Sequence, residues 1–197
     1  MAKNLPVWLL LTAALVFLGI ALLPLLRVAL GIDAQIGLPF LTTVMLLIGG
    51  LMSGLSAMIL LVRRVPPLSL DATADHTNTK PVMLMHASGL LLYTGIPLLN
   101  FLVAYWLWVR FRHENPHLNW LGREVLNFQV TIYLYLLLSL FMVFAAIGVV
   151  TTPLLLVFHL AATLYAIAKT SAGRAFTYPA NIPIIQGRRA PEAPASQ

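Results

Sequence analysis

GREVLNFQVTIYLY, residues 122–135, carries the last two charges before a long apolar run. Arg123 and Glu124 lie near its start, and residues 125–168 contain no Lys, Arg, Asp or Glu. A membrane-spanning helix needs roughly 20 apolar residues to cross about 30 Å of hydrocarbon, so this run is about twice as long as one span requires. The run is therefore predicted to fold back on itself as a helical hairpin, with its turn at Thr151, Thr152 and Pro153.

The same stretch places polar residues at the open end of the predicted hairpin, where the membrane begins. If it is helical, Glu124, Asn127 and Thr131 fall three and four residues apart on one face, and Gln129 and Tyr133 form a second polar pair beside them. Polar groups at the edge of hydrocarbon cost several kcal/mol unless they are paired. This face is therefore the predicted interaction site of the chain.

The composition defines the broad class of protein. Hydrophobic residues make up 60% of the chain and charged residues 9%, and four stretches lack charge altogether: residues 4–26, 34–62, 81–109 and 125–168. These features predict an all-α, multi-pass membrane protein. The excess of Lys and Arg sits at the ends of apolar segments, where it anchors to lipid headgroups, so the bilayer is the expected partner and nucleic acid is not. With no cysteine, the chain has no disulfide, Fe–S cluster or thiolate metal site.

The distribution of basic residues favours one topology. The segment 81–109 is interrupted at Gly95, Pro97 and Asn100, and it either crosses the membrane or enters and returns. If it crosses, there are five spans and the twelve Lys and Arg residues divide eight against four. If it returns, there are four full spans, and eleven of the twelve lie on one side, with only Arg27 opposite. We expect four full spans plus one broken or re-entrant segment, with both termini cytoplasmic; five spans is the alternative.

The predicted organisation has four parts. Residues 1–64 are expected to form two N-terminal transmembrane helices, 65–80 a polar loop, 81–185 a helical core and 186–197 a disordered tail. In the second helix, Gly50 and Gly54 form a GxxxG pattern that allows close approach of another helix, from this chain or from another. In the interrupted segment, the Asn100 amide is expected to satisfy backbone groups freed by the break.

Several other residues suggest chemistry. His113 to His117 reads HENPH, which matches a zinc protease pattern, but Pro116 removes the helix that would align the two histidines, so no metal site is predicted. His86 and His159 lie in different apolar segments and could ligate a haem, although hydrogen bonds between helices are the expected use.

The residues that precede Gly122 have predicted roles at the membrane interface and at the start of the next helix. Trp106 and Trp108, next to Arg110 and Arg112, are typical of an aromatic belt at the membrane interface. Asn119 is the predicted cap of the helix that carries Glu124, which places the carboxylate near the positive end of the helix dipole.

Four motifs occur in order along the second half of the chain. They are H-A-S-G-L-L-L-Y-x-G-I-P-L-L-N from His86, W-x-W-V-R-x-R-H-E-N-P from Trp106, G-R-E-V-L-N-F-Q from Gly122, and A-x-A-K-x-x-x-G-x-x-x-x-Y-P ending at Pro179. With these motifs the chain resembles the DUF4870 family of small bacterial membrane proteins, which is similar to the chloroplast Tic20 group. The resemblance implies a compact helical bundle in the bacterial inner membrane and no established activity.

Three functions follow as expectations. The first is a non-enzymatic accessory or scaffold subunit that docks onto other membrane protein subunits, or onto itself, through its transmembrane helices. The alternatives are a Tic20-like translocation or channel component and a haem-binding membrane subunit. No catalytic residue, resident cofactor or metal is assigned. The predicted interaction residues are Glu124, Asn127, Gln129, Asn100, Gly50, Gly54, Tyr178 and Pro179.

Overall fold

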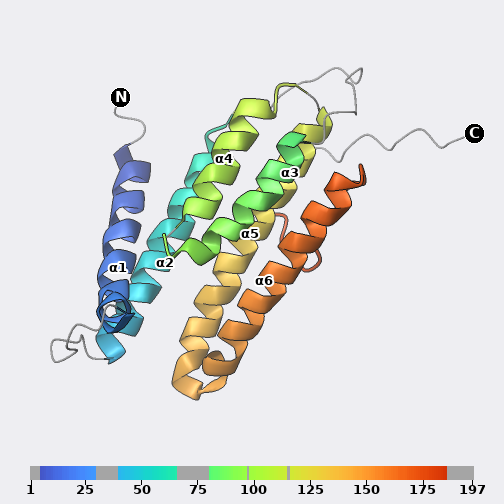
Figure 1. Ribbon diagram of the computed structural model, residues 1–197. Helices are drawn as coiled ribbons and strands as arrows, with labels where there is room; N and C mark the ends of the chain where they lie inside the picture. Colours follow the sequence, from blue (N-terminus) through green and yellow to red (C-terminus); the bar gives the residue numbers. More distant parts are fainter. Residues whose placement is uncertain (1–4, 30–39, 66–79, 97, 115, 186–197) are drawn as a thin grey trace, which may run out of the picture. The chain divides into compact units, whose positions relative to one another are not determined.

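A computed structural model describes residues 5–29, 40–65, 80–96, 98–114 and 116–185 (Figure 1). Across these ranges the chain is helical and contains no strand, which confirms the all-α class. The helices are α1 (Leu5–Ala29), α2 (Phe40–Arg63), α3 (Lys80–Ala87), the 3-10 helix η3 (Ser88–Thr94), α4 (Leu99–Phe111), α5 (Pro116–Met142), the 3-10 helix η4 (Val143–Ala145) and α6 (Ile147–Ser171).

Three of the described helical stretches are long and apolar enough to cross a membrane: Thr42–Arg63, Pro116–Ala145 and Ile147–Ser171. The stretches Val7–Ile20 and Leu99–Phe111 are apolar but shorter.

The chain forms two compact units, one containing Met1–Leu61 and Tyr133–Leu155, the other Val62–Ile132 and Leu156–Gln197. Most of the predicted loop 65–80 and the whole predicted tail 186–197 lie outside the described residues.

In the first unit, the GxxxG of α2 packs against α1. A Cβ atom on Gly50 would lie 2.5 Å from Leu18 Cγ and 3.1 Å from the Leu18 backbone nitrogen, so only a glycine fits there without movement. Gly49 lies beside Phe17, and Gly54 is buried. The partner of this small-residue face at Gly50 is therefore a helix of the same chain.

The turn between α5 and α6 is not at the predicted residues. The chain reverses through η4 and Ala146, whose φ is 60°, and Pro153 lies inside α6. Thr151 and Thr152 instead place their hydroxyls 2.5 Å and 2.8 Å from Ser139 Oγ on α5. The predicted position of the turn was wrong because these threonines lie within α6, where their hydroxyls hydrogen-bond to α5 just beyond the turn.

The interrupted segment of the second unit is a helical hairpin. α3 and η3 run along one side of α4, and the chain reverses between Gly95 and Leu98, whose φ angles are 76° and 63° (Figure 1). Pro97 lies outside the described residues. Gly122 faces both Met85 of the first arm and Trp108 of the second, which shows that the arms are antiparallel. The predicted interruption is confirmed, while the number of membrane crossings stays a prediction.

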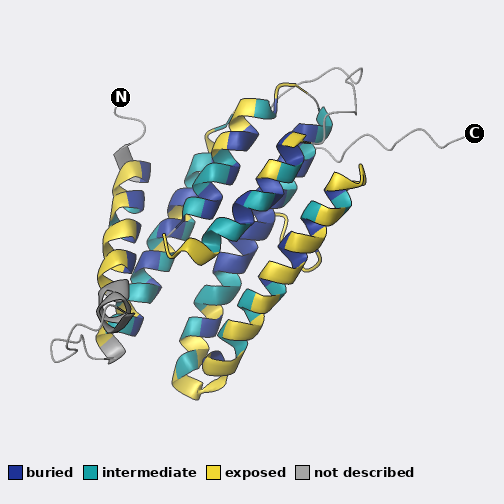
Figure 2. Cartoon of the chain, in the orientation of Figure 1, coloured by how far each residue is buried: buried dark blue, intermediate teal, exposed yellow. Residues whose placement is uncertain are grey.

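Helix α5 contributes many of the buried side chains of the second unit (Figure 2). Its buried apolar residues there are Leu118, Leu121, Val125, Leu126, Phe128, Val130 and Ile132. By contrast, α6 exposes Val157, Leu160 and Leu164 along one face. Exposed apolar residues at helical spacing on a long apolar helix are what a lipid-facing surface requires.

Candidate functional site

The polar face of α5 is covered by the C-terminal segment of the same chain, residues 176–185, which we call the strap. The Tyr178 backbone N–H donates to Glu124 Oε1 at 3.1 Å, and Asn181 Nδ2 donates to the Glu124 carbonyl at 3.4 Å. One turn further, Asn127 holds Ile185 through two hydrogen bonds: the Ile185 N–H donates to Oδ1 at 2.7 Å, and Nδ2 donates to the Ile185 carbonyl at 3.3 Å.

Thr131 completes this contact. The Ile182 N–H donates to Thr131 Oγ1 at 3.0 Å, and the Thr131 hydroxyl lies 3.5 Å from Asn181 Oδ1. Three α5 side chains at positions i, i+3 and i+7 thus bind the backbone of a non-helical segment. Polar groups that are costly to leave unpaired near hydrocarbon are satisfied within the chain. A role for this face toward another protein stays a prediction.

The strap inserts Tyr178 into the core of the unit. The Tyr178 hydroxyl and His86 Nδ1 share a hydrogen bond of 2.8 Å, and the phenol ring stacks on Phe128 with centroids 3.7 Å apart. Burial, with the Glu124 carboxylate nearby, raises the pKa of the Tyr178 hydroxyl. Pro179, the other predicted strap residue, is exposed at a turn. Tyr178 therefore links the strap to the hairpin, and the predicted interaction role of Pro179 stays a prediction.

A second tyrosine–histidine pair lies deeper along the hairpin. The Tyr93 hydroxyl donates to the Leu156 carbonyl at 2.7 Å and lies 3.0 Å from His159 Nδ1. Because the hydroxyl has only one proton and directs it at the carbonyl, Nδ1 must be the donor to the Tyr93 oxygen. Neutral His159 therefore carries its proton on Nδ1 and has a bare lone pair on Nε2. The expected hydrogen bond between helices is confirmed for His159, which joins α6 to η3, whereas His86 bonds to the non-helical strap.

Gln129 faces the hairpin. Its side chain is 1% exposed, and its Nε2 donates to Ser88 Oγ at 3.3 Å. Its Oε1 is one of several buried polar atoms that have no hydrogen-bond partner among the described residues. The others around the hairpin are His86 Nε2, His159 Nε2 and Thr163 Oγ1.

The remaining predicted site residues lie apart from this cluster. Asn100 is buried in the first turn of α4, directly after the hairpin turn, and its expected role in satisfying backbone groups stays a prediction. Gly50 and Gly54 belong to the first unit, where Gly50 packs against Leu18 of α1 and Gly54 is buried. The structure therefore gathers Glu124, Asn127, Gln129 and Tyr178 around α5.

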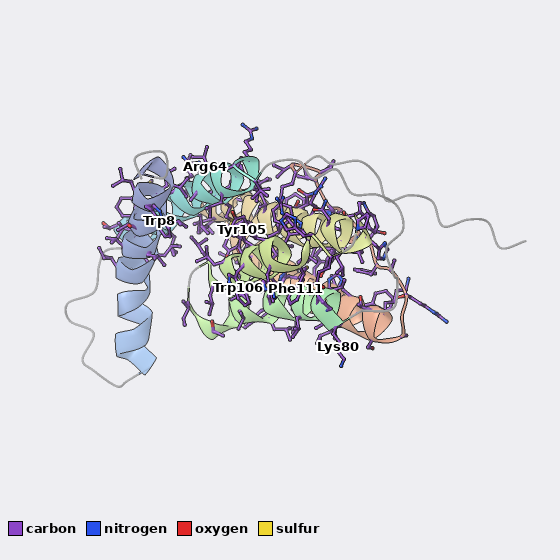
Figure 3. All side chains as sticks on the ribbon, turned by 90° about the horizontal axis from the view of Figure 1, so that it is seen from above. Trp8, Arg64, Lys80, Tyr105, Trp106 and Phe111 are labelled. Atoms are coloured by element: carbon purple, nitrogen blue, oxygen red, sulfur yellow. The ribbon has the colours of Figure 1, made fainter. Side chains whose placement is uncertain are left out.

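Two expectations at the junction of α4 and α5 are wrong. Asn119 does not cap α5, because α5 begins at Pro116; instead Asn119 Oδ1 accepts a hydrogen bond from Trp108 Nε1 at 3.0 Å. Trp108 is 2% exposed and lies beneath the Arg112 guanidinium, so it is a core residue. Trp106 is 63% exposed (Figure 3), and its position at the membrane interface stays a prediction.

The HENPH motif does not form a single helical turn. His113 lies in the turn after α4 and accepts a hydrogen bond from Arg112 Nε at 3.3 Å, whereas His117 lies in the first turn of α5. In the described part of the chain, no three His, Cys, Asp or Glu residues gather as metal ligands. The zinc protease reading therefore has no geometric support.

Sequence reasoning missed the partners that complete the site. Tyr93, Thr163 and the strap residue Asn181 were not predicted to face α5 or the hairpin. The apolar patch from Ile182 to Ile185 was expected to fold back against the protein or lipid headgroups, but without a partner on α5. The available signal was the strap itself: a short stretch of polar and apolar residues, with two prolines and one asparagine, that follows a membrane helix. Three spaced polar side chains on α5 matched that stretch, but about 50 residues separate the two in sequence.

The fold and site define a multi-pass α-helical membrane protein whose polar core is closed by its own C-terminal strap. Residues 77–185, more than half of the chain, match the model of the MamF/MmsF family, described as the magnetosome magnetite crystal formation protein family. The chain belongs to this family. No curated protein and no solved structure matches it significantly. The resemblance to the DUF4870 and Tic20-like proteins is therefore corrected: the motifs that suggested it fall inside the MamF/MmsF match.

Proposed function

We propose that this protein is a non-enzymatic accessory membrane subunit that supports magnetite crystal formation in a bacterial magnetosome membrane. The observation that carries the proposal is the extent of the family match. Residues 77–185 include the α3–α4 hairpin, α6 and the strap, and with them the α5 face that binds the strap. The part of the chain that the family shares is thus the part that forms the strapped polar core.

The same region supports a topology for the protein. At about 1.5 Å per residue the 13 residues of α4 extend about 20 Å, less than the roughly 30 Å of hydrocarbon. The hairpin therefore enters the bilayer and returns, while α1, α2, α5 and α6 cross it. Lys80 begins the hairpin and Arg110 lies in the last turn of α4, so both lie at its base. Because basic residues favour the cytoplasmic side, we propose that both termini are cytoplasmic.

The partners of such a subunit are lipid and other membrane proteins or further copies of this chain. The exposed apolar face of α6, with Val157, Leu160 and Leu164, suits both lipid and a partner helix. The α5 polar face is already bound by the strap, so docking through the outer helix surfaces is the arrangement that leaves the core intact. No catalytic group is assigned.

Deletion and complementation test the proposal. In a magnetite-forming bacterium that carries this gene, deletion is expected to change the number or size of the crystals seen by electron microscopy, and the wild-type gene is expected to restore them. A strap-deficient variant, Asn127→Leu with Thr131→Val, is expected to complement poorly, whereas the exposed strap substitution Thr177→Ala complements fully. Unchanged crystals in the deletion strain would overturn the proposal.

A further inference from the structure

Two arginines lie close together at the base of the hairpin, where α4 ends and α5 begins. The Arg112 guanidinium lies over the Trp108 ring, 5.4 Å from its centroid. Gly122 packs against the same ring, because a Cβ atom on this glycine would overlap Trp108 Cδ1. Arg123 is the next residue, and its positive charge and that of Arg112 repel each other. Two like charges therefore lie beside one buried tryptophan.

The surrounding side chains hold this pair in place. Arg112 is only 5% exposed, and its Nε donates to His113 Nε2 at 3.3 Å. Trp108 Nε1 in turn donates to Asn119 Oδ1 at 3.0 Å. Arg123 follows Asn119 by four residues on α5, so the two share a helical face, and Arg123 is partly buried. The fold thus positions both guanidiniums instead of leaving them extended in solvent.

The carboxylates of the described residues are used elsewhere. Glu114 lies 3.9 Å from Arg110, in an exposed contact within one turn. Glu124, the other described acidic residue, accepts a hydrogen bond from the Tyr178 backbone N–H. Neither carboxylate pairs with Arg123. Because partly buried like charges are costly unless an opposite charge lies near them, an anion beside Arg123 would stabilise this arrangement.

The position of the two arginines along the chain indicates where that anion comes from. Arg123 and Glu124 are the last charges before residues 125–168, which contain none. Arg112 directly follows the apolar helix α4. Both guanidiniums therefore lie where apolar helices reach the lipid headgroups, and basic pockets between membrane helices bind the headgroups of anionic lipids.

We infer that Arg112 and Arg123 form a binding site for the phosphate group of an anionic phospholipid. A guanidinium presents its N–H donors as a planar fork that matches two oxygens of a phosphate. The bound phosphate offsets the repulsion between the two arginines. Trp106 and Val109, which are exposed and three residues apart on α4, provide apolar surface for the acyl chains. Free phosphate has the same anionic chemistry but no acyl chains, so the position at the membrane boundary favours the lipid.

The test is lipid binding by the purified full-length protein after delipidation in a neutral detergent. The protein is titrated separately with phosphatidylglycerol, phosphatidylcholine and inorganic phosphate. Native mass spectrometry detects bound lipid, and thermal unfolding reports stabilisation. We expect saturable binding of phosphatidylglycerol and a higher unfolding temperature with this lipid alone. Equal stabilisation by inorganic phosphate would overturn the assignment to a lipid, and equal stabilisation by phosphatidylcholine would overturn the anion site.

Substitutions at two neighbouring arginines separate this site from general charge attraction. Arg123→Gln is expected to weaken phosphatidylglycerol binding about 10-fold or more, because it removes charge-assisted hydrogen bonds. Arg110→Gln is the matched control: it removes the same charge from an exposed arginine that pairs with Glu114, and it is expected to leave binding unchanged. Equal weakening by the two substitutions would overturn the inference.

The stability of Arg123→Gln without lipid keeps the test decisive, because substitution of the buried Arg112 can disturb folding. In the delipidated protein, Arg123→Gln removes the repulsion from Arg112 and is expected to be at least as stable as the wild type. With phosphatidylglycerol present, the wild type is expected to become the more stable of the two. A lower stability of Arg123→Gln both with and without the lipid would show that Arg123 has a purely structural role and would overturn the inference.

Discussion

Asn127 and Ile185 are 58 residues apart and are joined by a pair of hydrogen bonds between a side-chain amide and a backbone. The Ile185 N–H donates to Asn127 Oδ1 at 2.7 Å, and Asn127 Nδ2 donates to the Ile185 carbonyl at 3.3 Å. The amide thereby satisfies both backbone polar groups of Ile185. The contact fixes the end of the strap without depending on the Ile185 side chain.

Asn127→Leu is expected to release the end of the strap. The substitution leaves the Ile185 backbone groups without partners and removes two hydrogen bonds, a loss of about 1–3 kcal/mol. Hydrogen exchange followed by mass spectrometry should show faster exchange in residues 182–185, with α5 unchanged. Thr177→Ala, at an exposed strap position, serves as the control. Equal protection of residues 182–185 in the Asn127→Leu and control proteins would show that the pairing does not hold the strap.

Tyr178 is expected to make stability fall at alkaline pH. Burial raises the pKa of its hydroxyl in the folded protein, so above pH 10, near the ordinary tyrosine pKa, only the unfolded chain loses this proton. The stabilisation is complete below that pH and is lost progressively above it. Thermal unfolding in detergent between pH 8 and about pH 11 should therefore show a steeper decline for the wild type than for Tyr178→Phe. Parallel declines would contradict the prediction.

Gly50→Ala is expected to loosen the contact between α1 and α2. The added Cβ atom would meet Leu18 Cγ at 2.5 Å, so one helix must move. Gly19→Ala is a matched control, because a Cβ atom there has no neighbour within 4 Å. Alanine is the better helix former by roughly 0.5–1 kcal/mol, so the control should be neutral or slightly stabilised while Gly50→Ala unfolds at a lower temperature. Similar shifts in both variants would argue against close packing at Gly50.

The sequence predicted those features whose cause is local. The charge-free runs specified membrane helices, and Gly95 marked the interruption at which the hairpin turns. The spacing of Glu124, Asn127 and Thr131 placed them on one face. Features that depend on distant segments were missed. Nothing near Asn127 indicates that its partner is the Ile185 backbone, and the histidine–tyrosine pairs join residues more than 60 positions apart.

Two local signals were misread for a related reason. Thr151, Thr152 and Pro153 have the composition of a turn, but the threonine hydroxyls bond to Ser139 and Pro153 is accommodated within α6. Asn119 has the chemistry of a helix cap, yet α5 already begins at Pro116 and the Asn119 side chain is used by Trp108. In each case the side chain makes a tertiary hydrogen bond instead of the turn or cap that its residue type favours locally.

Side-specific labelling tests the central claim that the hairpin enters the membrane and returns while α5 and α6 cross it. The chain has no cysteine, so single cysteines at Asp75, Glu114 and Ala145 can each be probed with an impermeant maleimide in intact cells and in inverted vesicles. We expect Asp75→Cys and Glu114→Cys to react from the cytoplasmic side and Ala145→Cys from the opposite side. Labelling of Asp75→Cys and Glu114→Cys from opposite sides would contradict the account.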